Sequence, residues 1–157
     1  TGKYERIVSV GMFEHVGHKN YTVFMETARN LLHEDGLFLL HTIGANQKRL
    51  SVDPWIEKYI FRNGILPSIG QIGDAVSGRF VMEDWHNFGV DYDKTLMAWA
   101  ENFSRGREEG KFTCTDSMFR MFRYYLLSCA GAFRARDLQL WQIVLSPHGV
   151  TDGYRRP

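Results

Sequence analysis

The sequence predicts an α/β fold, because two short apolar strand segments flank an amphipathic helix near the start of the chain. Residues 6–11 form a β-branched run that ends in Gly, which is typical of a buried strand, and residues 37–42 form a second apolar run. Between them, apolar side chains recur at helical spacing over residues 21–32, with Asn20 as a candidate N-cap and Gly36 as a candidate stop. A strand, a helix and a strand within about 40 residues predict a right-handed βαβ unit and a parallel sheet.

The rest of the chain continues the alternation of helices and strands. Asp53-Pro54 is a helix-start pair, and Ser68 is placed to cap a second short helix over residues 69–76. Further apolar patterns predict a strand, two helices separated by a glycine-punctuated loop, and a last strand. These later elements are a strand over 80–85, a helix after Asp91, a loop at Gly106 and Gly110, a helical face from Met118 to Phe133, and a strand over 139–145 that Pro147 ends.

Composition places the chain among ordinary globular proteins. Its 157 residues are 44% hydrophobic and 24% charged, and no run approaches the roughly 18 apolar residues of a membrane-spanning helix. The net charge of +1 argues against a general nucleic-acid binder. The two cysteines belong to no Cys/His cluster, so we expect no metal site and a reducing, cytoplasmic location.

Positive charge gathers in one segment. Residues 103–136 carry seven Lys or Arg against three Asp or Glu, whereas residues 1–102 carry ten against thirteen. A solvated helix face is the ordinary explanation for such an imbalance. The more specific, functional explanation is an anionic partner such as a phosphate-bearing membrane surface.

The predicted elements are too few to cover both faces of a parallel sheet. The sequence also has no Gly-rich loop of the kind that receives a nucleotide or adenosyl group between a strand and a helix. Gly11 and Gly17 are too far apart for such a loop, and Glu14 between them is anionic. Because the chain also begins with Thr, we expect it to be the second half of a doubly wound domain.

Candidate catalytic side chains lie where the predicted strands end. Glu14 follows the first strand and His41 ends the second, and the carboxyl ends of adjacent parallel strands meet at one edge of a sheet. Tyr92 opens a helix whose apolar face could be turned to the same region, and Cys129 lies within the aromatic face of another helix. Each also has an ordinary explanation, as a surface carboxylate, a satisfied core histidine, a core aromatic or an inert buried cysteine.

Five stretches of the sequence resemble the bacterial cyclopropane-fatty-acyl-phospholipid synthases. They span most of the chain, their joint specificity is high, and they correspond to the later part of the family's methyltransferase domain. The resemblance implies a Rossmann-like, S-adenosylmethionine-dependent methyltransferase fold, of which residues 1–157 form the C-terminal part of a single catalytic domain without its Gly-rich cofactor loop. The stretches are RIVSVGMFEHVGHKNY (6–21), GLFLLHTIG (36–44), VDPWIEKYIFRNGILPS (52–68), VMEDWHNFGVDYDKTLMAW (81–99) and YYLLSCAGAFRARDLQLWQ (124–142).

The resemblance implies that S-adenosylmethionine methylates a cis double bond of an unsaturated phospholipid acyl chain, after which proton loss closes a cyclopropane ring. It also implies that the base is a bound bicarbonate, whose ligands would be Glu14, His41, the backbone of Ile43, and Tyr92. Cys129 matches the position often assigned as the family's active-site cysteine. Because a bicarbonate base needs no thiolate, we expect Cys129 to line the pocket. Aromatic faces suit this chemistry, because they attract a developing carbocation and help to exclude water.

Partners and location follow from the same resemblance. We expect a phospholipid substrate, contact of residues 103–136 with the anionic inner face of the membrane, and a cytoplasmic protein that binds no nucleic acid. An exposed first strand predicts homo-oligomerisation or strand exchange. Without the cofactor loop, we expect the 157 residues by themselves to be inactive. Two alternatives stay open: an acyl-chain methyltransferase that gives branched products, and a non-catalytic lipid-binding module.

Overall fold

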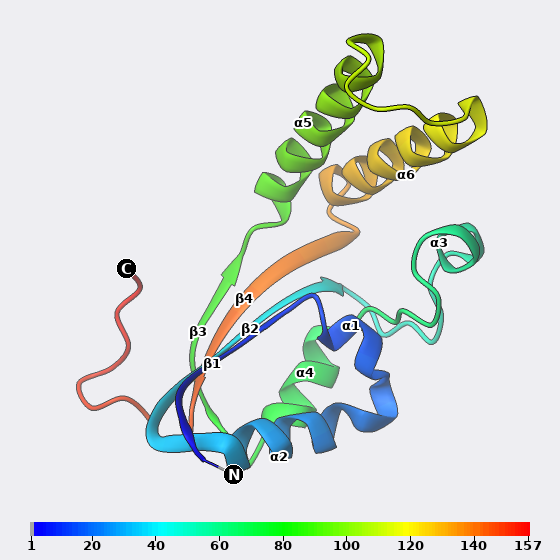
Figure 1. Ribbon diagram of the computed structural model, residues 1–157. Helices are drawn as coiled ribbons and strands as arrows, with labels where there is room; N and C mark the ends of the chain where they lie inside the picture. The colour runs from blue at the N-terminus through cyan, green and yellow to red at the C-terminus, as the bar shows by residue number, and fades with distance from the viewer. Residues whose placement is uncertain (1) are drawn as a thin grey trace. The chain divides into compact units, whose positions relative to one another are not determined.

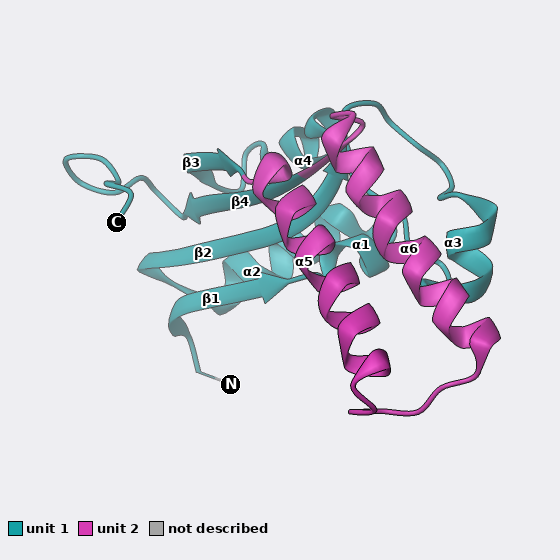
Figure 2. Cartoon of the chain, turned by 90° about the horizontal axis from the view of Figure 1, so that it is seen from above, with its two compact units in different colours: residues 1–87, 140–157 teal, residues 88–139 magenta. Residues whose placement is uncertain are grey.

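The structure is a computed structural model that describes residues 2–157. The chain divides into two compact units, residues 1–87 with 140–157 and residues 88–139 (Figure 1, Figure 2). The first unit holds a sheet with its helices, and the second is a pair of long helices. The order of strands and helices along the described chain agrees with the predicted one.

The first unit is built on a four-stranded sheet with the strand order β1-β2-β4-β3. β1 (Tyr4–Val10) and β2 (Leu32–Ala45) are parallel, and α2 (Tyr21–Leu31) lies between them in the sequence. This arrangement confirms the predicted strand–helix–strand unit. It also confirms that the ends of β1 and β2 lie side by side, since Val10 is in register with His41.

The other pair of strands departs from the predicted parallel sheet. β3 (Val81–Asn87) and β4 (Leu138–Ser146) are antiparallel. The register gives the reason, because Asn87 at the end of β3 is opposite Trp141 near the start of β4. The chain therefore leaves and re-enters the sheet at the same end, and the returning strand has to run the opposite way.

Two of the short helices begin at the predicted capping residues. The Asp53 carboxylate accepts hydrogen bonds from the backbone N–H groups of Trp55 and Ile56 at 2.9 and 3.1 Å. Ser68 forms a reciprocal capping box with Gln71, which satisfies two backbone donors that the first helical turn leaves open. The short helices of this unit are α1 (Phe13–Val16), the 3-10 turn η1 (His18–Asn20), α3 (Pro54–Tyr59) and α4 (Ile69–Val76).

Two predicted boundary residues of α2 have other roles. Asn20 does not cap the helix through its side chain; its amide donates instead to the carbonyl of Val16 at 2.8 Å. Gly36 does not end the helix, because β2 begins directly at Leu32. The pairing with β1 skips from Leu32 to Leu37, so Gly36 lies in an irregular part of the strand.

The hydrophobic core lies on one face of the sheet. α1, α2 and α4 lie together on that face (Figure 1, Figure 2). Alternate residues of β2 and β4 point toward these helices, as the twofold period of a strand requires. The fully buried members include Met25 of α2, Phe38 and Leu40 of β2, Ile72 of α4, and Trp141, Ile143 and Leu145 of β4.

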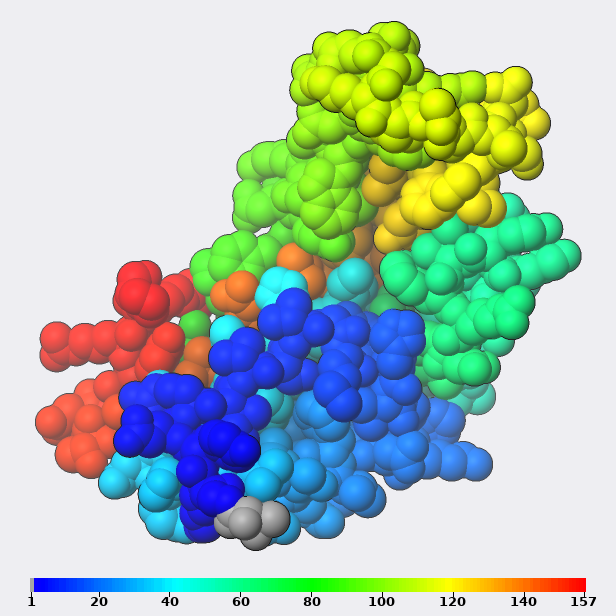
Figure 3. Space-filling model, viewed as in Figure 1, coloured from blue at the N-terminus to red at the C-terminus, as the bar shows by residue number. Residues whose placement is uncertain are grey.

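β1 is an edge strand and is less buried than its sequence predicts. Val8 and Val10 are 62% and 65% exposed, and Ser9 is the one residue of β1 classed as buried. The segment that contains β1, dark blue, lies at the surface of the space-filling view (Figure 3). The prediction of a buried strand is therefore wrong, because a β-branched run is equally compatible with an edge that lacks a neighbour.

The second unit is formed by α5 (Gly89–Glu108) and α6 (Asp116–Arg134). Phe103 of α5 stacks on Phe112 in the connection and on Phe119 of α6, with ring centroids 5.2 and 5.3 Å apart. Gly106 lies inside α5 and not in the predicted loop. It is buried, and a Cβ at this position would be 3.1 Å from the ring of Phe112, so close packing explains the glycine.

We expect Gly44→Ala to destabilise the first unit, because a Cβ at Gly44 would lie 2.0 Å from Cζ3 of the fully buried Trp141. Overpacking of this kind costs about 3 kcal/mol of unfolding free energy at its upper end. Urea denaturation followed by tryptophan fluorescence measures the loss. The matched control is Gly73→Ala in α4, where a Cβ would meet nothing within 4 Å. That control should gain up to about 1 kcal/mol from helix propensity, and equal stability of the two variants would contradict the packing argument.

Candidate active site

Glu14 is held in a buried position directly after β1. Gly11, with a φ of +63°, turns the chain out of the strand, and α1 then places Glu14 so that it is 7% exposed. Its Oε1 accepts a hydrogen bond from the backbone N–H of Ile43 at 2.7 Å. Its Oε2 is buried and has no hydrogen-bond partner among the described residues. A buried carboxylate oxygen without a donor is costly, so this oxygen marks a place where a ligand could bind.

His41 lies beside Glu14 at the end of the parallel pair. Its carbonyl accepts from the backbone N–H of Gly11 at 3.0 Å, which ties β2 to the turn that leads to Glu14. Its Nδ1 lies 3.2 Å from Nε2 of Gln142 on β4. The imidazole is half-buried, on the sheet face opposite the core.

The environment of His41 favours a neutral ring. Burial lowers the pKa of His41 below its ordinary value, and the negative charge of Glu14 acts in the opposite direction as the weaker cause. Glu14, His41 and the backbone of Ile43 are therefore brought together within the first unit, as the positions of the strand ends predict.

Tyr92 and Cys129 belong to the second unit. Tyr92 lies on α5 in edge-on contact with Phe133 of α6, with ring centroids 5.0 Å apart, and it makes a similar contact with Trp99 at 5.9 Å. Cys129 lies on α6 and is partly buried. The five predicted site residues thus divide between the units, three in the first and two in the second.

Burial controls the protonation of the groups around Cys129. It raises the pKa of the Cys129 thiol to about 11, so the sulfur carries a proton near neutral pH. It also raises the pKa of Tyr125 to about 12, with Cys129 and Tyr92 as the lesser causes. A protonated thiol gives no support to a nucleophilic role for Cys129.

Sequence reasoning overlooked two polar residues beside Glu14 and His41. Tyr21 was predicted as part of an apolar helix face, but its hydroxyl donates to the carbonyl of Ile65 at 3.3 Å. Burial, and then the charge of Glu14, raise the pKa of Tyr21 to about 12. Gln142 was predicted only as part of a strand. A signal for Gln142 was present in the sequence, because this residue interrupts the apolar run of residues 140–145.

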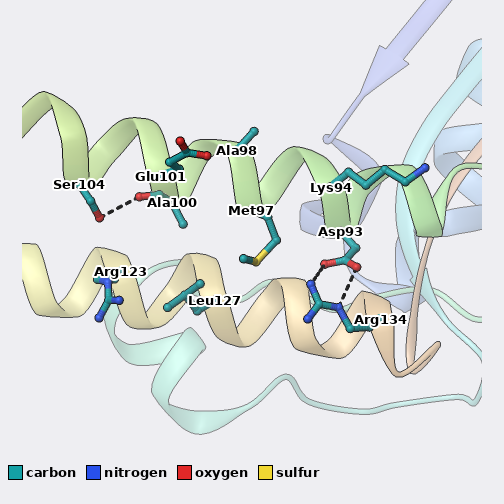
Figure 4. A pocket seen from close by; sticks show the side chains of 10 residues that line it. All are labelled: Asp93, Lys94, Met97, Ala98, Ala100, Glu101, Ser104, Arg123, Leu127 and Arg134. Atoms are coloured by element: carbon teal, nitrogen blue, oxygen red, sulfur yellow. Dashed lines mark hydrogen bonds and ion pairs between the residues drawn. The ribbon is translucent and has the colours of Figure 1, made fainter.

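A groove of about 630 Å³ lies along α5 and α6 in the second unit. Figure 4 shows Met97 and Leu127 toward its middle and Arg123 toward one end. At the other end Arg134 donates to both carboxylate oxygens of Asp93, each at 3.0 Å. The lining of the groove is therefore mixed, with apolar side chains beside cationic ones and the carboxylates of Asp93 and Glu101. Within residues 2–157, no group of three His, Cys, Asp or Glu is placed to hold a metal ion.

Comparison with solved structures places the fold among S-adenosylmethionine-dependent methyltransferases. The cyclopropane synthase MmaA2 from Mycobacterium tuberculosis superposes with a TM-score of 0.82 at 28% identity, over 92% of this chain and 55% of that one. The mycolic acid cyclopropane synthase CmaA1, solved in complex with SAH and CTAB, gives a TM-score of 0.80 at 28% identity, over 92% and 56%.

Sequence comparison identifies the family. The family model described as mycolic acid cyclopropane synthetase matches residues 1–143. Cyclopropane-fatty-acyl-phospholipid synthase of Escherichia coli (strain K12) is 57% identical over 153 residues, which are 98% of this chain and 40% of that protein. A probable fatty acid methyltransferase of Pseudomonas putida is 31% identical over 161 residues, with the same two coverages. The chain belongs to the mycolic acid cyclopropane synthetase family, and it spans about 40% of the length of these two relatives.

The lowered pKa of His41 predicts a loss of stability in acid. The unfolded chain binds a proton to this histidine at a higher pH than the folded chain does, so stability falls as the pH drops through the ordinary histidine pKa of about 6.5. Thermal melting from about pH 7 to about pH 5 should show wild type losing more stability than His41→Gln, which lacks the titration. His33→Gln, an exposed histidine of the same strand, is the matched control and should follow wild type. Parallel curves for wild type and His41→Gln would contradict this account.

Proposed function

We propose that this chain forms part of the catalytic domain of a cyclopropane fatty acid synthase, which acts on unsaturated acyl chains of phospholipids. The single observation that carries the proposal is the buried Glu14 carboxylate beside the half-buried His41 in a chain 57% identical to the Escherichia coli enzyme. When bound, S-adenosylmethionine would supply the methyl group and bicarbonate would supply the base that takes up the proton. We place most of the S-adenosylmethionine contacts outside these 157 residues, because no Gly-rich loop follows any of their strands.

The residues around Glu14 fit an anion that can also donate a proton. The free Oε2 of Glu14 is a buried acceptor, which suits the O–H of bicarbonate. A neutral His41 can donate from one ring nitrogen to an anionic oxygen. The backbone N–H of Ile43 is already bonded to Glu14, so its contribution is to hold that carboxylate in place.

The aromatic residues of the second unit fit the methyl-transfer step of the proposed reaction, in which positive charge develops on the acyl chain. A methylated alkene carries positive charge until a proton leaves, and aromatic faces attract cations. Tyr92, Tyr125 and Phe133 supply such faces next to the protonated Cys129. In this proposal they line the place where the acyl chain reacts and keep water away from it.

The basic segment supports contact with an anionic membrane surface on its cytoplasmic side. Arg120 and Arg123 of α6 are exposed and border a second groove of about 520 Å³, together with Phe119, Tyr124 and Leu127. Cationic side chains next to exposed aromatic ones are typical of peripheral membrane contacts. Within the described residues, no helix is long and apolar enough to cross a membrane.

The exposed edge of β1 supports a further proposal about assembly. Unpaired strand edges with apolar side chains readily pair with another chain. We therefore propose that two copies of this chain associate through β1, where Val8 and Val10 are exposed.

Replacing His41 tests the proposed reaction. In cells that express the complete gene, gas chromatography of fatty acids should show cyclopropane acids, and His41→Ala should reduce them at least about 100-fold, because a base that is no longer held in place ceases to contribute to the reaction. His33→Ala, an exposed histidine on the same strand, should leave them unchanged. Methyl-branched acids would favour the acyl-chain methyltransferase, an activity that the name of the Pseudomonas putida relative describes. Binding of unsaturated phospholipid without any new acid would favour the non-catalytic module.

Charge removal on α6 tests the membrane contact. The product of the complete gene should bind phosphatidylglycerol vesicles more tightly than phosphatidylcholine vesicles, and added salt should weaken that binding. Each basic side chain near an anionic surface contributes about 1 kcal/mol, so Arg120→Gln with Arg123→Gln should weaken binding roughly thirty-fold. Lys48→Gln with Arg62→Gln removes the same charge from exposed positions of the first unit and serves as the control. A vesicle affinity that changes neither with added salt nor in the α6 variant would overturn the proposal.

A further inference from the structure

Gln142 is the polar side chain that contacts the imidazole of His41 directly. It lies on β4, next to β2 in the sheet, with its Nε2 3.2 Å from Nδ1 of His41. An amide nitrogen of this kind can only donate a hydrogen bond. With the amide oriented in this way, Nδ1 of His41 accepts and the proton of the neutral ring lies on Nε2, whereas the opposite orientation of the amide would reverse both assignments.

The surroundings of Gln142 make this contact costly to lose. On its face of β4 its neighbours are Leu140 and Val144, which are 6% and 8% exposed. A half-buried amide between two buried aliphatic side chains needs a hydrogen-bond partner. The opposite face of β4 carries Trp141 and Ile143, which pack into the core and fix the strand. Gln142 is thus attached to a rigid part of the sheet.

The charges that face His41 leave the choice of tautomer to Gln142. Glu14, from α1, is the charged group that acts on the ring, and its effect on protonation is weaker than that of burial. β1 contributes Val10 opposite His41, and β4 contributes the uncharged Gln142. With the ring neutral, either nitrogen can carry the proton unless a neighbour decides between them.

We propose that Gln142 is a positioning residue, whose amide holds His41 as the tautomer that carries its proton on Nε2. The ring then offers a hydrogen-bond donor at Nε2, which is the polarity needed to hold the anion of the proposed base site. The role of the Nε2 donor in holding an anion rests on the proposed function. The assignment of the tautomer is independent of that function and can be observed without any turnover.

Nitrogen NMR of the product of the complete gene, labelled with ¹⁵N-histidine, tests the tautomer. His41→Asn identifies the His41 signals by their disappearance. Wild type should show an unprotonated Nδ1 and a protonated Nε2. Gln142→Glu replaces the donor by a carboxylate of the same shape, which accepts from Nδ1–H. That variant should move the proton to Nδ1 and raise the pH at which His41 becomes charged.

Activity then measures what the tautomer contributes. Gln142→Met keeps the length of the side chain but cannot donate, and it should lower the yield of cyclopropane acids about 10- to 100-fold, the range seen when hydrogen-bond partners of functional histidines are removed. Gln142→Glu should lower it at least as much and displace its pH profile. The control is Gln139→Glu on the same strand, whose amide bonds to Arg136. It should keep the wild-type His41 spectrum.

The outcomes distinguish a failure of the role proposed for Gln142 from a failure of the proposed function. A protonated Nδ1 in wild type, or full activity in Gln142→Met, overturns the role of Gln142. Wild-type protein with the Nε2–H tautomer but no cyclopropane product overturns the proposed function instead. A wild-type His41 spectrum in Gln142→Glu also overturns the inference, because the amide would then not decide where the proton lies.

Discussion

The hydrogen bond from the backbone N–H of Ile43 to the Glu14 carboxylate is the interaction on which the candidate site depends. It joins the helix that follows β1 to the end of β2, and the second carboxylate oxygen is buried with no hydrogen-bond partner among residues 2–157. The bond needs both strand ends at the same level of the sheet. The parallel register, with Val10 opposite His41, provides this. Chemistry at this end of the sheet therefore follows from strand pairing.

The core supports that arrangement from the other face. Trp141 packs against Gly44, the residue after Ile43, at a distance that excludes any side chain there. The same strand carries Gln142 to the imidazole of His41. Successive residues of a strand point to opposite faces, so one strand both fixes the core and positions the histidine. β2 and β4 therefore carry core residues on one face and the candidate site residues His41 and Gln142 on the other.

Predictions from the sequence held where contacts between residues close together in the chain determine the structure, as at helix caps and strand ends. The caps at Asp53 and Ser68 and the ending of β4 are confirmed, because each depends on neighbouring residues. Predictions failed where distant residues decide. β3 and β4 are antiparallel because the chain returns at the end of the sheet that it left. Gly36 resembles a helix stop, yet β2 already begins at Leu32, and Asn20 resembles a cap, yet its amide bonds to the carbonyl of Val16.

The sequence by itself determined the family resemblance, the class of fold and the residues Glu14, His41, Ile43, Tyr92 and Cys129 as candidates, because motifs and strand ends are local patterns. Their catalytic roles remain predictions. The tertiary structure decided that Glu14 has a buried free oxygen, that the Cys129 thiol is protonated, and that Gln142 faces His41. These properties arise from burial and from contacts across the chain. Gln142 is 101 positions from His41, and only the pairing of strands within the sheet brings them together.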